Sequence, residues 1–138
     1  MTVYLLDTDI LSLYQRGEAA VCRRVLVHAA SGVTISVITV EEQLSGWYTL
    51  LRRAKGRDRL AHAYENLART VRALSTLQIL SFTRAAIDRY EELKRLKLGV
   101  RANDLRIAAI ALEHGAVLVT RNLRDFGQIP ELGVEDWT

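Results

Sequence analysis

The sequence has very few of the residues on which several common kinds of site depend. Its 138 residues include one cysteine, one proline and three histidines. Cys22 has no second cysteine with which to form an internal disulfide, and its apolar surroundings predict a small core residue in a reducing, cytoplasmic setting. His28, His62 and His114 fall in separate predicted helices without any cysteine–histidine spacing, which disfavours a zinc site.

Long hydrophobic runs are also missing. No apolar stretch approaches the roughly 20 residues that a membrane-spanning helix requires, so we expect no membrane contact. Asp7 and Asp9 follow the first six residues at once, which leaves no room for the basic start and apolar stretch of a secretion signal. The sequence also lacks a phosphate-binding P-loop, a dinucleotide glycine pattern, a serine-hydrolase elbow and a metalloprotease helix motif. These absences favour a soluble, cytoplasmic protein.

Short β-rich runs alternate with longer helical ones, which predicts a parallel sheet covered by helices in a single domain, residues 1–138. The expected strands are Thr2–Leu6, Thr34–Val37, Gln78–Phe82, Ala116–Val119 and a short fifth near Val134. The expected helices are Ile10–Tyr14, Ala19–Ala30, Val40–Ala54, Arg59–Leu77, Arg84–Leu96 and Asn103–His114. Gly56 separates the third expected helix from the fourth, which indicates a helical hairpin.

Acidic residues follow the strand ends. Asp7 and Asp9 come directly after the first strand, Glu42 lies in the helix after the second, Asp104 opens the helix before the fourth, and Asp125 follows the fourth. The carboxyl ends of parallel strands share one edge with the amino ends of the neighbouring helices. We therefore expect these acids to converge.

Each acid also has a structural interpretation. Thr39 and Glu42 match a helix capping box, and Asp7 and Asp104 fit positions that stabilise helix N-termini. Converging carboxylates, however, repel one another unless a cation or raised pKa values relieve them. A hard divalent ion such as Mg²⁺ suits oxygen ligands and needs only one or two carboxylates with water and substrate phosphate.

The formal net charge is +3, and the basic residues cluster. A span of eight residues around Gly56 holds Arg52, Arg53, Lys55, Arg57 and Arg59, while Arg121 and Arg124 flank a second polar loop. Such runs occur as solvated helix ends, and they also hold nucleic-acid backbones. Beside a carboxylate-held Mg²⁺ they favour phosphodiester hydrolysis by a metal-activated water.

These segments, taken in order, resemble the VapC toxins of the PIN-domain superfamily almost end to end. The likeness rests on Leu6–Asp9, Ser36–Gly46, Ala102–Ala109, Val119–Asn122, Asp125–Phe126 and Val134–Trp137. It implies a three-layer α/β/α domain with a parallel sheet of four to five strands. It also implies a Mg²⁺- or Mn²⁺-dependent endoribonuclease that forms a homodimer and is held inactive by a small VapB-like antitoxin.

Carried over by position, the resemblance makes Asp7, Glu42 and Asp104 the catalytic triad, with Asp7 and Asp104 as the expected metal ligands. Many PIN domains have a fourth acid where this chain has Asn122, which puts a second tightly held metal in doubt; Asp125 is then the expected catalytic contributor from that loop. The residues expected to surround the acids are Thr8, Asp9, Thr120 and Asn122. The expected RNA contacts are Arg52, Arg53, Lys55, Arg57 and Arg121.

Two alternatives stay open at this point. Leu5–Asp9 resembles the start of a haloacid-dehalogenase-like phosphohydrolase. Such enzymes usually also need a lysine, and none of the three lysines directly follows a predicted strand. A PIN-like nucleic-acid-binding module without turnover is the other alternative. Trp47, Tyr48, Leu50 and Leu51 indicate either a face for the dimer partner or antitoxin, or part of the core.

Overall fold

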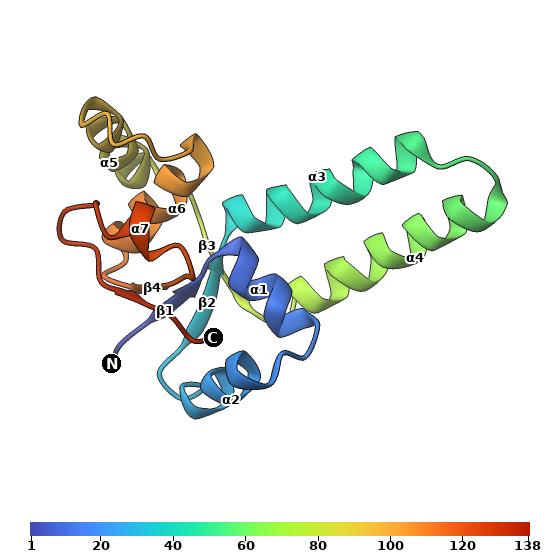
Figure 1. Cartoon of the computed structure of the whole chain (residues 1–138), viewed down its shortest axis with the longest axis horizontal. Coiled ribbons are helices and arrows are strands. Elements are labelled where there is room, and N and C mark those ends of the chain that lie inside the picture. The colour runs from blue at the N-terminus through green and yellow to red at the C-terminus, as the bar shows by residue number, and fades with distance from the viewer.

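A five-stranded parallel sheet forms the centre of the molecule in a computed structural model that describes residues 1–138 (Figure 1). The strands are β1 (Tyr4–Leu6), β2 (Val33–Ser36), β3 (Gln78–Leu80), β4 (Val117–Val119) and β5 (Val134–Glu135), in the order β3-β2-β1-β4-β5. The chain moves from β1 through β2 to β3 and then returns to the other side of β1 for β4. That reversal places a switch point between β1 and β4, where open parallel sheets bind ligands.

Helices cover both faces of the sheet (Figure 1). One layer contains α1 (Thr8–Gln15) and α2 (Ala19–Val27), and the other contains α5 (Arg84–Arg95) and α6 (Ala102–Glu113). The short α7 (Leu123–Phe126) follows β4. This arrangement confirms the three-layer α/β/α fold. None of the helices combines the length and the apolar composition that a membrane span requires.

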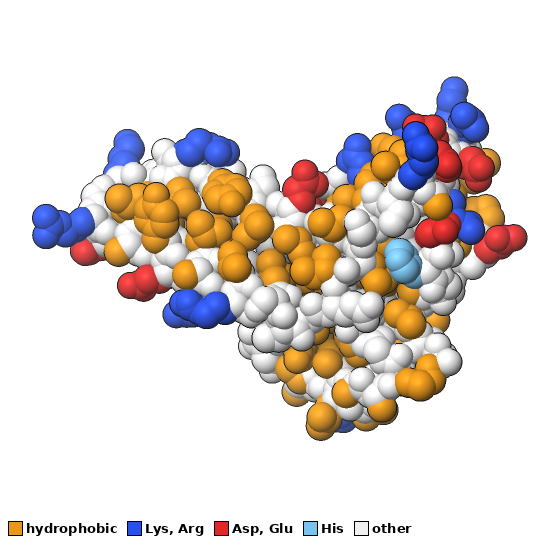
Figure 2. Space-filling view, turned by 180° about the vertical axis from the view of Figure 1, so that it is seen from behind, with side chains coloured by type: hydrophobic (Ala, Val, Ile, Leu, Met, Phe, Trp, Pro, Cys, Tyr) orange, Lys and Arg blue, Asp and Glu red, His pale blue; other side chains and the backbone are white.

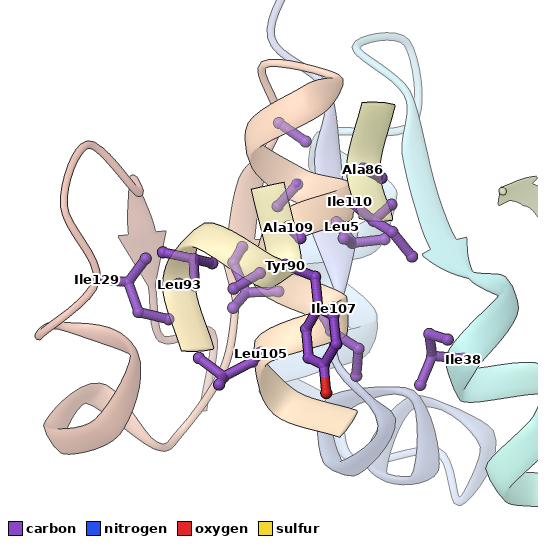
Figure 3. Packing of buried hydrophobic residues seen from close by; sticks show 14 of the residues in the cluster. Leu5, Ile38, Ala86, Tyr90, Leu93, Leu105, Ile107, Ala109, Ile110 and Ile129 are labelled. Atoms are coloured by element: carbon purple, nitrogen blue, oxygen red, sulfur yellow. The ribbon is translucent and has the colours of Figure 1, made fainter. Parts of the chain in front are cut away.

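The sheet separates two hydrophobic cores because successive side chains of a strand point to opposite faces. Leu5 packs with residues of α5 and α6, as Figure 3 shows, whereas Tyr4 and Leu6 pack with α1 and α2. In β4, Leu118 belongs to the first core and Val119 to the second. Since β1 is buried on both faces, the residue that follows it is held in a fixed position at the sheet edge.

Helices α3 (Val37–Arg53) and α4 (Arg57–Leu74) form a hairpin that projects from the body (Figure 1). Gly56, with a φ of +83°, precedes α4, so the predicted break is confirmed. Side chains of Tyr48 and Leu50 are exposed, and those of Trp47 and Leu51 are half-buried. Assignment of Tyr48 and Leu50 to the core is therefore wrong. Figure 2 shows apolar side chains along this arm and basic ones at its end.

The start of α3 differs from the prediction. Ser36, not Thr39, is the N-cap, and its hydroxyl accepts a hydrogen bond from the Thr39 amide at 3.1 Å. The helix begins at Val37, three residues earlier than expected, and the preceding strand ends at Ser36. The capping-box interpretation of Glu42 is consequently wrong, because Glu42 lies in the second turn. Helix α7 was not predicted, since four residues are too few to show periodicity.

Candidate active site

A polar cavity of about 620 Å³ lies at the carboxyl edge of the sheet, next to the switch point. Its walls come from the end of β1, from α1, α3 and α6, and from the loop and short helix after β4. All five acids that were expected to converge line it, together with two arginines and other residues: Asp7, Thr8, Asp9, Ser12, Glu42, Arg101, Asp104, Arg121, Asn122, Asp125 and Phe126.

Asp7 is the most buried of these acids, with 7% of its surface exposed. It is the N-cap of α1, and its carboxylate accepts a hydrogen bond from the Ile10 amide at 2.8 Å. Burial raises the pKa of Asp7 to about 6; hydrogen bonds from Ile10 and Thr120 oppose the rise, and the nearby charges of Asp9 and Asp104 add to it. Asp7 forms no ion pair within the chain, so its charge is only partly compensated.

Glu42 is anchored to α1 by the hydroxyl of Thr8. Thr8 Oγ1 donates to Glu42 Oε1 at 2.7 Å and lies 2.9 Å from the hydroxyl of Thr39. This contact joins the first turn of α1 to the second turn of α3. It fixes one oxygen of Glu42 and leaves Oε2 directed at another partner.

That partner is Arg101, the N-cap residue of α6. Its Nη2 lies 3.6 Å from Glu42 Oε2, and its Nε lies 3.4 Å from Asp104 Oδ2. Asp104 sits in the first turn of α6, where a carboxylate also interacts favourably with the helix dipole. Arg101 was not among the site residues predicted from the sequence, although its spacing of three residues from Asp104 at a helix start is a recognisable ion-pair pattern.

The loop after β4 completes the cavity. Thr120 is buried, and its hydroxyl accepts a hydrogen bond from the Asn122 backbone amide at 2.9 Å. The same hydroxyl donates a hydrogen bond to the Asp7 carboxylate. The side-chain oxygen of Asn122 caps α7 by accepting a hydrogen bond from the Asp125 backbone amide. The side-chain nitrogen of Asn122 donates a hydrogen bond to the Asp125 carboxylate at 3.0 Å. Asn122 therefore positions Asp125 at the cavity wall. Arg121 Nε donates to Asp9 Oδ2 at 2.7 Å across the mouth.

The donor set fits a hard divalent cation completed by water. The carboxylates present only oxygen ligands. Asp7 is a buried acid without a cationic partner, and a bound cation would offset the free-energy cost of burying its charge. No three acidic or imidazole side chains form a ready-made cage, and Arg101 stands between Glu42 and Asp104. These residues can therefore hold an ion with one or two carboxylates, and the assignment of Asp7 and Asp104 as its ligands stays a prediction.

The basic residues predicted to contact RNA fall into two places. Arg121 lines the cavity, whereas Arg52, Arg53, Lys55 and Arg57 are exposed at the far end of the α3–α4 hairpin. A second cavity, of about 530 Å³, lies at that end and includes Arg53 and Arg59. The hairpin end is therefore a basic surface separate from the acidic cavity.

The fold and the acidic cavity define an α/β/α protein with an oxygen-ligand site at its switch point, and similarity to known proteins narrows this class. The family model described as the PIN domain matches residues 4–132. The chain belongs to the PIN-domain family, which confirms the resemblance found in the sequence.

Individual relatives agree with this assignment. The chain is 37% identical over 93 residues to the tRNA(fMet)-specific endonuclease VapC of Salmonella typhimurium, an alignment that spans 64% of this chain and 70% of the relative. It is 28% identical to ribonuclease VapC2 of Rickettsia felis over 98% of both chains. A solved toxin–antitoxin complex from Klebsiella pneumoniae contains a chain of similar fold, with a TM-score of 0.71, 28% identity and 98% of each chain covered.

Proposed function

We propose that this protein is a Mg²⁺- or Mn²⁺-dependent endoribonuclease, the toxin of a VapBC-type pair acting in the cytoplasm. The observation that carries the proposal is the cavity in which Asp7, Glu42, Asp104 and Asp125 meet beside Arg101 and Arg121. Two relatives named as VapC nucleases support the ribonuclease assignment. Membership of the PIN family removes the haloacid-dehalogenase alternative.

Each acid has a distinct environment and so a distinct part in hydrolysis. Asp7 and Asp104 would hold the cation, which supplies a Lewis acid for the phosphodiester and the attacking water. Glu42, fixed at one oxygen by Thr8, has its second oxygen free to orient that water and take its proton once Arg101 moves aside. The new bond would form between water oxygen and phosphorus, and the bond from phosphorus to the leaving oxygen would break, with the leaving oxygen taking up a proton from solvent. Asp125, positioned by Asn122, lines the wall of the same cavity.

Exposed arginines are suited to hold the RNA backbone, since the phosphates contribute most of the electrostatic affinity. Arg121 lies at the cavity mouth, and the hairpin end offers Arg52, Arg53, Lys55 and Arg57. We further propose a VapB-like antitoxin as partner and a homodimer as the working assembly. The toxin–antitoxin complex of similar fold supports the first, and the exposed apolar residues of the hairpin provide surface for association.

The deciding experiment compares Asp104→Asn with Asp88→Asn, a matched change at an exposed aspartate of α5. Total RNA is incubated with each purified variant and Mg²⁺, with and without EDTA, and the products are separated on a gel. We expect cleavage by the wild type and Asp88→Asn, its loss with EDTA, and its absence in Asp104→Asn. Folded Asp104→Asn that still cleaves, or wild type that binds RNA without cleaving it, would contradict the proposal; the latter result would favour the binding-module alternative.

A further inference from the structure

Arg101 contacts two of the four acids to which catalysis is assigned above. Its guanidinium reaches Glu42 of α3 and Asp104 of α6, at 3.6 and 3.4 Å. The two carboxylates come from helices far apart in the chain, and this one side chain spans the gap between them. Arg101 therefore contacts Asp104, one of the two expected ligands of the cation, and would compete with the cation for that carboxylate.

The hold on Arg101 is weak. Both distances exceed the 2.7–2.9 Å of a strong charge-assisted hydrogen bond, whereas Arg121 meets Asp9 at 2.7 Å. The side chain of Arg101 is 70% exposed. The side chains of Glu42 and Asp104 are 22% and 17% exposed, so solvent reaches these pairs mainly from the arginine side. Ion pairs that are open to solvent contribute about 0–1 kcal/mol, because water and salt screen them and ordering two side chains costs entropy. A doubly charged ion that binds carboxylate oxygen directly competes successfully with such a pair.

Once displaced, the guanidinium stays near the cavity. Its backbone is fixed at the N-cap of α6 and its side chain lines the cavity, so the displaced guanidinium remains within reach of the mouth. There it is a free, permanently charged fork whose geometry matches two phosphate oxygens. The mouth is also where an RNA strand must enter to reach the acids.

We propose that Arg101 exchanges partners: it pairs with Glu42 and Asp104 when the cavity holds no divalent ion, and it binds an RNA phosphate when the ion is present. This inference rests on the proposed function. It assigns Arg101 a role as a phosphate-binding residue that is available only to the ion-loaded protein. Empty protein would hold RNA less tightly at the cavity as a result.

The first test is the affinity for Mn²⁺ alone, measured by calorimetry at low ionic strength in wild type, Arg101→Gln and Arg121→Gln. The second arginine is a matched control, since it lines the same cavity and loses the same charge. Removal of the competing guanidinium should tighten Mn²⁺ binding by about threefold to fivefold in Arg101→Gln. Arg121→Gln should change it less, because Arg121 pairs with Asp9 and not with the expected ligands.

The second test is binding of a labelled 20-nucleotide RNA of randomised sequence, with Ca²⁺ as the hard divalent ion or with EDTA, and with intact RNA verified on a gel. Arg101→Gln should weaken RNA binding about tenfold with Ca²⁺ and by less than twofold with EDTA. Arg121→Gln should weaken RNA binding by about the same factor with Ca²⁺ as with EDTA. Circular dichroism verifies that each variant is folded.

The outcomes separate this inference from the proposed function. If wild type binds Mn²⁺ and Arg101→Gln binds it no more tightly than Arg121→Gln, partner exchange is wrong and the metal site stands. Equal loss of RNA affinity with and without Ca²⁺ in Arg101→Gln also overturns it. If wild type binds no divalent ion, the proposed metal dependence fails together with the inference.

Discussion

Helix α3 carries two very different surfaces, one near each end. Glu42 is held by Thr8 inside the acidic cavity, whereas Arg52 and Arg53 are exposed at the hairpin end. Roughly 16 Å of helix separates Glu42 from Arg53, at about 1.5 Å per residue. The cavity is built on packed elements with hydrogen-bonded side chains, while the hairpin end has few partners apart from its own two helices.

The difference indicates a division of labour. Hydrolysis depends on oxygen atoms placed with sub-ångström precision, which buried strands and helix starts can supply. Backbone phosphates are repetitive and flexible, so a projecting basic arm can bind them without rigid placement. Changes to the acids of the cavity should therefore affect the rate, and changes at the hairpin end should affect affinity and its salt dependence.

The largest expected effect separates two adjacent glutamates of α3. Glu42→Gln should reduce the rate of RNA cleavage about hundredfold or more, since it removes the carboxylate that Thr8 orients in the cavity. Glu41→Gln should alter the rate by less than twofold, because Glu41 is exposed and lies outside this cavity. Single-turnover cleavage of total RNA measures both. Equal losses in the two variants would remove Glu42 from its proposed part.

The second effect concerns the cost of keeping Asp7 charged. Burial raises the pKa of Asp7 to about 6, so the folded state binds a proton between pH 4 and 6 that the unfolded state has released. Stability of the wild type should therefore fall as pH rises through this window. Asp7→Asn keeps a side-chain oxygen for the Ile10 amide and should be more stable by about 3 kcal/mol at pH 8.

Urea unfolding in EDTA at pH 4, 6 and 8 measures this difference, and the gap between the two proteins should close toward pH 4. Addition of Mg²⁺ at pH 8 should stabilise the wild type and leave Asp7→Asn nearly unchanged, because only the former keeps both expected ligands. A less stable Asp7→Asn at pH 8 would mean that capping outweighs the desolvation of the charge.

The third effect belongs to the hairpin end. Replacement of Arg52, Arg53, Lys55 and Arg57 by glutamine should weaken RNA binding about tenfold at moderate salt and reduce the slope of log K against log salt by up to about 3. The cleavage rate at saturating RNA should stay within about twofold of the wild type. An unchanged salt slope would assign these residues to an ordinary solvated helix end.

Several features of both regions were readable in the sequence. Asp7 follows a short apolar run that favours a buried strand, and Gly56 marks the turn of the hairpin. The start of α3 was not readable, because Ser36 and Thr39 are both good capping residues and only the strand pairing of β2 decides between them. The contact of Arg101 with Glu42 depends on how α3 and α6 pack, and local sequence carries no record of that distance.

The smallest expected effect is on stability, at the apolar surface of the hairpin. The side chain of Tyr64 is 57% exposed, so Tyr64→Ser should change the free energy of unfolding by less than about 0.5 kcal/mol in dilute protein. Leu118→Ala, which truncates a fully buried side chain of β4, should cost about 2–5 kcal/mol in the same urea titration. A loss in Tyr64→Ser that grows with protein concentration would place this surface in a contact between two copies of the chain, because only association makes stability depend on concentration. A loss of more than about 2 kcal/mol at every concentration would instead mean that the arm packs against the body in solution, and the contrast between anchored cavity and projecting hairpin would fail.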